Sequence, residues 1–328
     1  MSFRKRSDEY WENRAQEQLT FIEQQSIGYL RAIDRVYVEA RRANLEAVKS
    51  LYLNYYTKQG WDTAALRQIA PKGDIKRYIE DVRAAGLADR LPDGYGFRLN
   101  RLELLEAQMW LESNKAGTAQ LALQTSAHTE TVKASYEYSL YNLSKGTGVV
   151  PAFSQLNTQT IDTILNTDFY GKNYSQRIWN NTNALSKDLK NTLAKSIATG
   201  QSYTKTSKDI KERYDVTRYQ ANRLVQTETA RFNTLATDES YNNIGIEEWV
   251  YIATLDGRTD DDCGRHDGKR FPMDGGPFIP LHPGCRCCKR AFLAKEFEPD
   301  ERVMRDPVTG KNRNISNMSF DQWQGLYK

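Results

Sequence analysis

The sequence predicts a mainly α-helical protein with a small α+β module near its C-terminus. Two observations lead to this class. Six of the nine prolines lie between Pro272 and Pro307, while none lies before Pro71 or between Pro151 and Pro272. Because a proline inside a helix costs about 3 kcal/mol, long proline-free runs are where helices can form. By contrast, residues 249–254 are β-branched and aromatic, which is typical of a strand.

The first proline-free run predicts one long or two consecutive amphipathic helices over Asp8–Thr57. Apolar residues recur there at three- and four-residue spacings with charged residues between them, as on a helix with one buried face. The turn signals Pro71–Gly73 and Pro92–Gly94 then flank a short helix over Ile75–Ala85. Helical spacing returns over Asn100–Ser135.

The middle of the chain contains a candidate domain junction. Residues 136–152 are rich in Tyr, Ser and Gly, and the run Gly146–Pro151 lies near the end of this segment. Beyond them the sequence predicts helical segments from 155 to Gly200, a helix opening at Ser207–Tyr214, and another over Thr217–Ile244.

The C-terminal part changes character. The strand over 249–254 precedes an Asp-Gly turn and a short return strand at Lys269–Pro272. Residues 299–328 are polar and are expected to form a loosely attached tail. The predicted organisation is therefore a helical N-terminal region for partner binding (1–150), a C-terminal domain (151–298) with a compact segment at 255–292, and the tail.

Composition and charge exclude few classes of protein, but the sequence predicts the cellular compartment. With 46 basic and 42 acidic residues the net charge is only +4, so charge does not by itself indicate a nucleic-acid binder. No stretch approaches the ~20 apolar residues that cross a bilayer. Residues 1–10 lack the apolar run of a signal peptide, so we expect a cytoplasmic chain, in which clustered cysteines serve as metal ligands more often than as disulfides.

All four cysteines and two of the three histidines fall within residues 263–288. Thiolate and imidazole are the ligands that hold structural zinc, and two short ligand pairs separated by a loop can build a tetrahedral site. The sequence therefore predicts a zinc knuckle, which makes the fold mainly α with a small C-terminal α+β zinc-knuckle module. With four protein ligands, the site would be closed and structural.

Six side chains compete for four ligand positions. Cys263 and His266 form one pair and Cys285 and Cys287 the other, and these four are preferred. His282 is the alternative, displacing one cysteine. Cys288 would point away from Cys287 in an extended segment.

Several segments resemble a known family when taken in order. They are Gly200–Tyr203, Arg223–Asn233, Glu248–Trp249, Leu255–Thr259, Cys263–Lys269 and Pro280–Cys287. Over about residues 185–292 the sequence is similar to the C-terminal domain of phage Mu F-like minor head proteins, also called phage head morphogenesis proteins. The family commonly has Cys-x-x-Cys where this chain has Cys263-x-x-His266, and histidine is equally a zinc ligand.

The resemblance implies a non-enzymatic component of the virion of a tailed phage. Such proteins enter the procapsid in low copy, associate with the portal protein, and assist head assembly or genome delivery; scaffold and major capsid protein are further candidate partners. The expected location is the head interior, with the host cytoplasm during assembly. Asp256, Arg258 and Thr259 are expected to brace the turn before the knuckle, and Arg223 with Glu228 to dock the preceding helix.

The sequence also suggests three alternative functions. A zinc-scaffolded nuclease would need an open metal site with a histidine base, and only His128 and the acidic turn Asp260–Asp262 remain for it. Gln226-Thr-Glu228 resembles the Gln/Glu-x-Glu pair of ADP-ribosyltransferases, although it lies in a helical pattern. A DNA-binding virion protein is the third alternative, since Arg286, Lys289 and Arg290 adjoin other basic residues and would make salt-sensitive phosphate contacts.

Overall fold

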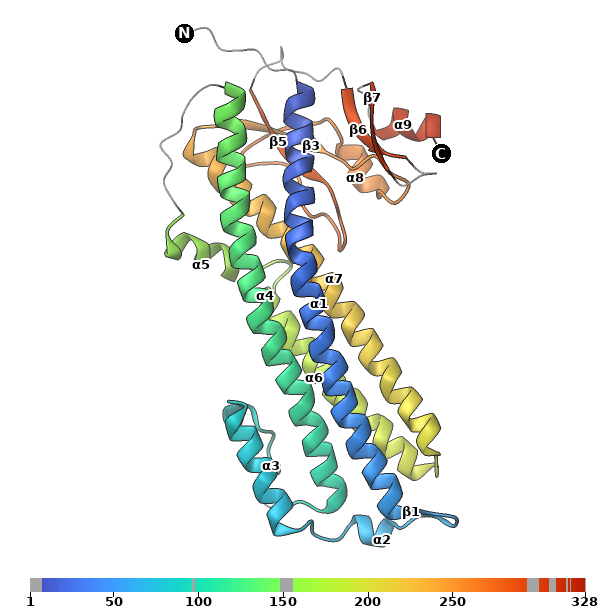
Figure 1. The fold of residues 1–328 in the computed structure, drawn as a ribbon. Coiled ribbons are helices and arrows are strands. Elements are labelled where there is room, and N and C mark those ends of the chain that lie inside the picture. The colour runs from blue at the N-terminus through green and yellow to red at the C-terminus, as the bar shows by residue number, and fades with distance from the viewer. Residues whose placement is uncertain are drawn as a thin grey trace. The chain divides into compact units, whose positions relative to one another are not determined.

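The computed structural model describes residues 8–95, 98–147, 156–293, 301–306, 311–316, 318 and 320–327. The chain divides into two compact units, and each is built from separate segments. Figure 1 labels the helices and strands. Unit 1 contains residues 1–29, 125–169 and 223–328, and unit 2 contains residues 30–124 and 170–222. Three long helices, α1 (Asp8–Tyr55), α4 (Arg101–Thr147) and α7 (Tyr203–Asn243), contribute residues to both units.

Unit 2 is helical. Besides its parts of the three long helices it contains the β1–β2 hairpin (Tyr56–Thr57 and Gly60–Trp61), α2 (Thr63–Leu66), α3 (Lys72–Ala84), a 3₁₀ turn (Ala88–Arg90) and α6 (Tyr174–Ala198). Apolar residues of α3 pack on α4 in a buried cluster that includes Tyr78 and Leu111. Gly117 of α4 lies against α6, where a Cβ would come within 2.5 Å of Thr182 Oγ1. The absence of a side chain at 117 therefore permits close packing of α4 on α6.

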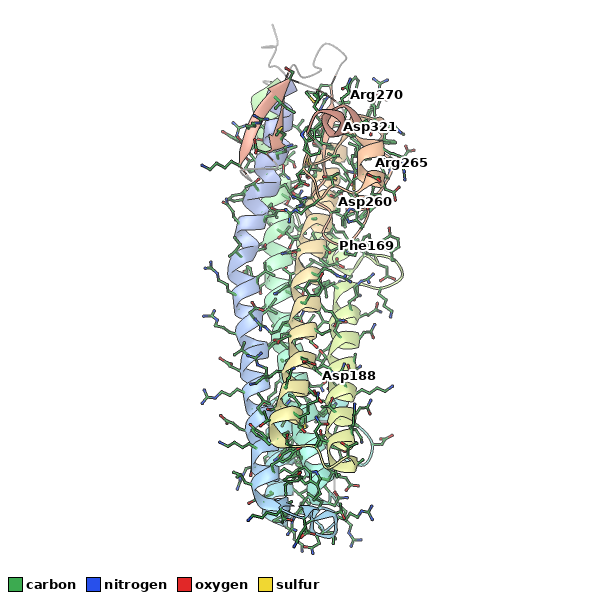
Figure 2. All side chains as sticks on the ribbon, turned by 90° about the vertical axis from the view of Figure 1, so that its right-hand side faces the viewer. Phe169, Asp188, Asp260, Arg265, Arg270 and Asp321 are labelled. Atoms are coloured by element: carbon green, nitrogen blue, oxygen red, sulfur yellow. The ribbon has the colours of Figure 1, made fainter. Side chains whose placement is uncertain are left out.

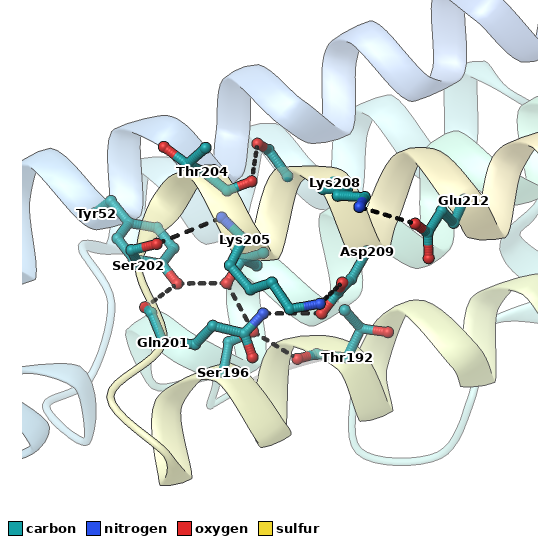
Figure 3. A network of polar contacts seen from close by, with 12 residues as sticks. Tyr52, Thr192, Ser196, Gln201, Ser202, Thr204, Lys205, Lys208, Asp209 and Glu212 are labelled. Atoms are coloured by element: carbon teal, nitrogen blue, oxygen red, sulfur yellow. Dashed lines mark hydrogen bonds and ion pairs between the residues drawn. The ribbon is translucent and has the colours of Figure 1, made fainter.

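Polar contacts fix the connection between α6 and α7 within unit 2 (Figure 3). Tyr52 Oη of α1 donates to the carbonyl of Gln201 (2.8 Å) and lies 2.6 Å from Thr206 Oγ1. Thr206 donates in turn to Ser196 Oγ (2.8 Å). Gln201 Nε2 donates to Asp209 Oδ2 (2.8 Å). These bonds satisfy polar groups that burial would otherwise leave unpaired.

The helices of unit 1 also meet through a buried polar layer. Gln18 Nε2 donates to Asn233 Oδ1 (2.9 Å) and to the carbonyl of Ser135 (3.2 Å). Ser139 Oγ donates to Gln18 Oε1 (3.2 Å). One side chain of α1 thus joins α4 and α7. The short helix α5 (Thr158–Asn166) belongs to the same unit.

A three-stranded antiparallel sheet forms a further part of the unit 1 core. β3 (Glu248–Ile252) is central, between β4 (Arg270–Pro272) and β5 (Cys288–Phe292). Trp249 pairs with Phe271 of β4, and Val250 pairs with Arg290 of β5. The helix α8 (Asp261–His266) lies in the loop between β3 and β4. Asp260, which is labelled in Figure 2, caps it by accepting from the backbone N–H of Asp262 at 2.9 Å.

The C-terminal segment has more structure than the sequence predicted. It contains the hairpin β6–β7 (Glu301–Arg305 and Asn312–Ser316) and α9 (Phe320–Tyr327). Met304 and Trp323 are fully buried with Leu255, and Trp323 Nε1 donates to Met304 Sδ (3.4 Å). Instead of the loosely attached tail expected for 299–328, its described residues therefore share an apolar core with the turn after β3.

The predicted helices and the strands β3 and β4 are confirmed, with two differences. α4 continues through residues 136–147, where a junction was expected, because Tyr136, Leu140 and Leu143 are buried. The helices predicted at Ser207–Tyr214 and Thr217–Ile244 are one, α7. The predicted boundary at 150/151 falls in residues 148–155, outside the described residues, and stays a prediction. No helix in the described part of the chain is long and apolar enough to cross a membrane.

Candidate metal centre

The centre is built on one face of β3. Side chains of a strand alternate between its two faces, and Trp249, Tyr251 and Ala253 lie in one buried cluster with Cys263, Cys285 and Cys287. Val250 and Ile252 lie in a different cluster with Leu19 and Cys288. Cys288 thus lies in a different cluster from Cys287, as the sequence predicted for an extended segment.

Three sulfurs converge on the first of these faces. The Sγ atoms of Cys263, Cys285 and Cys287 all lie within 4.8 Å of one another, and Cys263 Sγ is 3.7 Å from Cys285 Sγ. Around a tetrahedral metal with metal–sulfur bonds of ~2.3 Å, two sulfurs are ~3.8 Å apart. Hydrogen bonds from Cys263 and Cys287 lower the pKa of the Cys285 thiol. The three thiols therefore fit one face of a metal-binding tetrahedron.

His282 lies beside one corner of this triangle, at Cys263, but it does not belong to the group whose ligand atoms all lie within 4.8 Å of one another. Its Nε2 is 3.4 Å from Cys263 Sγ, close to the ~3.6 Å expected between nitrogen and sulfur ligands of one tetrahedral metal. Its Nδ1 is 3.2 Å from the carbonyl oxygen of Pro283. With the ring proton on Nδ1, that bond orients the imidazole and leaves the Nε2 lone pair for the metal, as is usual for metal-binding histidines.

His266 does not belong to the group of three sulfurs, and its place in the ligand set stays a prediction. It is the last residue of α8, and its Nδ1 lies 2.7 Å from the carbonyl oxygen of Asp262. Carbonyls at a helix C-terminus lack partners within the helix, so the imidazole satisfies one of them. The ring packs against Tyr251 and Phe271, at centroid distances of 5.6 and 6.2 Å. The Cys-x-x-His segment forms a helical turn rather than a ligand loop.

The turn between β3 and α8 is organised by a buried carboxylate. Asp256 accepts from the backbone N–H of Arg258 (2.9 Å), and both of its oxygens meet the guanidinium of Arg286, at 2.8 and 2.5 Å. Thr259 Oγ1 donates to the carbonyl of Thr254 and lies 3.3 Å from Asp256 Oδ1. Although burial opposes it, Arg286 lowers the pKa of Asp256. The arginine between Cys285 and Cys287 thus joins the cysteine loop to the preceding turn.

The sequence missed the partner of Glu228. Arg231 Nη1 donates to Glu228 Oε2 at 2.6 Å, and both side chains are fully buried. Arg231 also donates to the carbonyl of Thr167 and lies 4.7 Å from the ring of Phe232. Residues three apart share a helix face. Arg223, which the sequence predicted to dock this helix together with Glu228, is exposed. The i,i+3 spacing of Glu228 and Arg231 was the signal available in the sequence.

The basic residues proposed to contact DNA are largely buried. Lys289 Nζ lies 2.6 Å from Asp238 Oδ1, with 8% of its side chain exposed, and 4.2 Å from the centroid of the Trp249 ring. Arg290 is buried, and Arg286 is held by its carboxylate partner. These three side chains therefore do not form an exposed basic surface.

Their basic neighbours are exposed but compensated by acids. Arg270 Nε is 3.3 Å from Glu248 Oε1, and Arg265 pairs with Asp262 on α8. Both arginines are labelled in Figure 2. Phosphate binding at this cluster would have to break these pairs, so the arrangement does not favour it.

His128, the histidine left for a nuclease, lies in the helical part of unit 1. It is fully buried, and its ring packs at a tilt against Phe232, with 4.7 Å between ring centroids. Burial and the charge of Arg231 lower the pKa of His128 to about 3. A histidine that stays neutral in an apolar site beside an arginine is poorly suited to binding a catalytic metal with carboxylates.

One comparison with known proteins identifies the region that carries this centre. Residues 187–290 match the family model described as Phage Mu protein F like protein. This F-like region begins within α6 and ends in β5, so it contains all of α7, the three cysteines and His282. It also contains both members of the Glu228–Arg231 pair.

A curated protein gives a second, weaker similarity. The NAD(+)--arginine ADP-ribosyltransferase EFV of Enterococcus faecalis is 25% identical over 138 residues. These are 41% of this chain and 28% of that protein, so the chain spans well under two thirds of its relative. No solved structure matches the chain.

Proposed function

We propose that this chain is a minor head protein of a tailed bacteriophage. It would act in procapsid assembly or genome delivery, in association with the portal protein. The observation that supports this most directly is the match of residues 187–290 to the Phage Mu protein F-like family. The convergence of three cysteines in that region adds a physical reason for its compact fold. The protein would reside in the head and, during assembly, in the host cytoplasm.

The metal that we propose for the centre is zinc. Three thiols and an imidazole suit Zn²⁺, and four protein ligands leave no position for water, so the role is structural rather than catalytic. Bound metal would join the loop before β5 to α8 and thereby stabilise the F-like region. Elemental analysis should find about one zinc per chain, lost in Cys285→Ser. Cys288→Ser is the matched control, because Cys288 lies in the other cluster.

We propose that the chain is not an ADP-ribosyltransferase, despite its similarity to one. Glu228, the acid of the Gln226-Thr-Glu228 motif, is fully buried and bound by Arg231. A carboxylate in that position cannot reach a nucleotide without breaking a buried ion pair, which costs about 3–5 kcal/mol. Incubation with biotinylated NAD and an arginine-rich acceptor should give no labelling above a heat-inactivated sample.

The head assignment is tested in phage-infected cells. A stop codon in this gene should reduce the yield of infectious particles, and the wild-type protein should be present in purified proheads at low copy. Co-expression with the portal protein alone should give a complex that survives size-exclusion chromatography. Cys285→Ser should weaken incorporation, while Cys288→Ser should leave it near the wild-type level. Absence of the chain from both proheads and mature heads would refute the proposal.

A further inference from the structure

A groove of unit 2 runs between α1 and α7. It has a volume of about 350 Å³, and all of its lining residues belong to these two helices. Two contacts hold the helices together along this stretch. Asn44 Nδ2 donates to Tyr214 Oη (2.6 Å), and Arg41 pairs with Asp215 (3.1 Å). The groove is therefore a fixed feature of one unit, and it shares no residue with the metal centre.

The side chains that line the groove are mostly basic. The lining cations are Arg41, Arg42 and Lys49 of α1 and Lys211 of α7, and the lining acid is Glu46. Glu46 already pairs with Arg42 at 3.0 Å. Within the described residues, neither Lys49 nor Lys211 has an ion pair. A concave surface with uncompensated cations on both walls attracts a negatively charged partner.

Two apolar side chains line the same groove. They are Val38 and Leu45 of α1, and 38% of Val38 is exposed. These two residues are seven positions apart, as are Arg42 and Lys49. Seven residues are close to two helical turns, so each pair forms a stripe along α1 with about 10.5 Å between its members. A second helix with the same periodicity can match both stripes, with apolar residues on one and acids on the other.

We infer that this groove binds an acidic amphipathic helix of a partner protein. The apolar residues of that helix contact Val38 and Leu45, and its carboxylates pair with Lys49 and Lys211. The inference depends on neither the metal centre nor the head assignment. Duplex DNA fits the groove less well, because its backbone presents phosphates and sugars and leaves the apolar stripe uncovered.

The test measures binding of a synthetic peptide to the full chain by fluorescence anisotropy. The peptide is a helix of about 18 residues with leucines at three- and four-residue spacing and glutamates on both flanks. A scrambled peptide keeps its charge and loses its apolar face, and a short labelled DNA duplex serves as a second polyanion.

Three variants of the chain locate the binding. The double variant Lys49→Glu and Lys211→Glu reverses the two uncompensated charges, and Val38→Ser removes part of the apolar stripe. Lys187→Glu is the matched control, because Lys187 is an exposed lysine of α6 that does not line the groove. Since all of these side chains are exposed, the variants should melt near the wild-type temperature.

The wild-type chain should bind the helical peptide saturably and the scrambled peptide more weakly. Binding should be ~10-fold weaker in the double variant, because each reversal replaces an attraction by a repulsion of similar size. It should also weaken in Val38→Ser and stay unchanged in Lys187→Glu. Absence of saturable binding, or equal affinity for the two peptides, would overturn the inference. Tighter binding of the duplex, reduced in the double variant and unchanged in Val38→Ser, would also overturn it by assigning the groove to phosphates.

Discussion

Replacing His282 and His266 separately tests the geometry of the centre. His282 Nε2 lies 3.4 Å from Cys263 Sγ, whereas the His266 imidazole is bonded to the carbonyl of Asp262. His282→Ala should therefore remove a ligand, and His266→Ala should not. Both substitutions replace a histidine by alanine, one at the end of α8 and one in the loop before β5. Each therefore serves as the control for the other.

The magnitude follows from the number of ligands. Structural zinc sites with four protein ligands bind with apparent free energies of ~10–16 kcal/mol, so an equal share is about 3 kcal/mol per ligand. That loss weakens binding ~100-fold. At a free zinc concentration well above the wild-type dissociation constant, a ~100-fold weaker site lowers the free energy of unfolding by up to ~2.7 kcal/mol.

Two measurements check this expectation. Chelator competition gives the zinc dissociation constant, and urea unfolding at buffered free zinc gives the stability difference. His266→Ala should leave the dissociation constant unchanged and cost ~1 kcal/mol through lost contacts, equally with and without zinc. The reasoning is refuted if His266→Ala abolishes zinc binding while His282→Ala retains it, because the Cys-x-x-His pair would then be the ligand set.

Three further substitutions probe the surroundings of the centre and the helices. Arg231→Met leaves Glu228 unpaired in the core and should lower the free energy of unfolding by ~3–5 kcal/mol, as measured by urea denaturation; a loss below 1 kcal/mol would contradict a buried pair. Asp256→Asn should cost ~1–3 kcal/mol near neutral pH. Because the pKa of Asp256 is lowered in the fold, its contribution is present above the ordinary carboxyl pKa near 4 and lost as pH falls through the lowered value, so wild type and variant should converge in acid. Gly117→Ala places a Cβ 2.5 Å from Thr182 Oγ1 and should lower the melting temperature at a cost of ~1–3 kcal/mol, whereas the exposed Gly73→Ala should not.

Much of the secondary structure was predictable because it follows local rules. Proline-free runs and apolar spacing identified the long helices, and the β-branched, aromatic run identified β3. The continuation of α4 over residues 136–147 was not predictable from the sequence. Tyr and Ser are weak helix formers, and the helix there depends on buried contacts of Tyr136 and Leu143. Propensity alone could not outweigh a composition that resembles a loop.

For the candidate centre, the sequence was sufficient to predict which cysteines come together. Clustering of four cysteines indicated a metal site, and the alternation of an extended segment set Cys288 apart from Cys287. The choice between His266 and His282 depends on whether the residues after Cys263 form a loop or a helical turn, and six residues are too few for periodicity to decide.

The composition of unit 1 has a consequence for how the protein is made. Val250 and Ile252 of β3 are covered by Leu19, a residue of the first helix. At ~5–20 residues per second, a ribosome needs on the order of ten to fifty seconds to synthesise the chain between them, during which Leu19 lacks these two partners. A fragment limited to residues 187–290 would never acquire Leu19 as a partner, and the strand would keep one bare apolar face. The F-like region is thus a unit of sequence, while the unit that folds spans both halves of the chain.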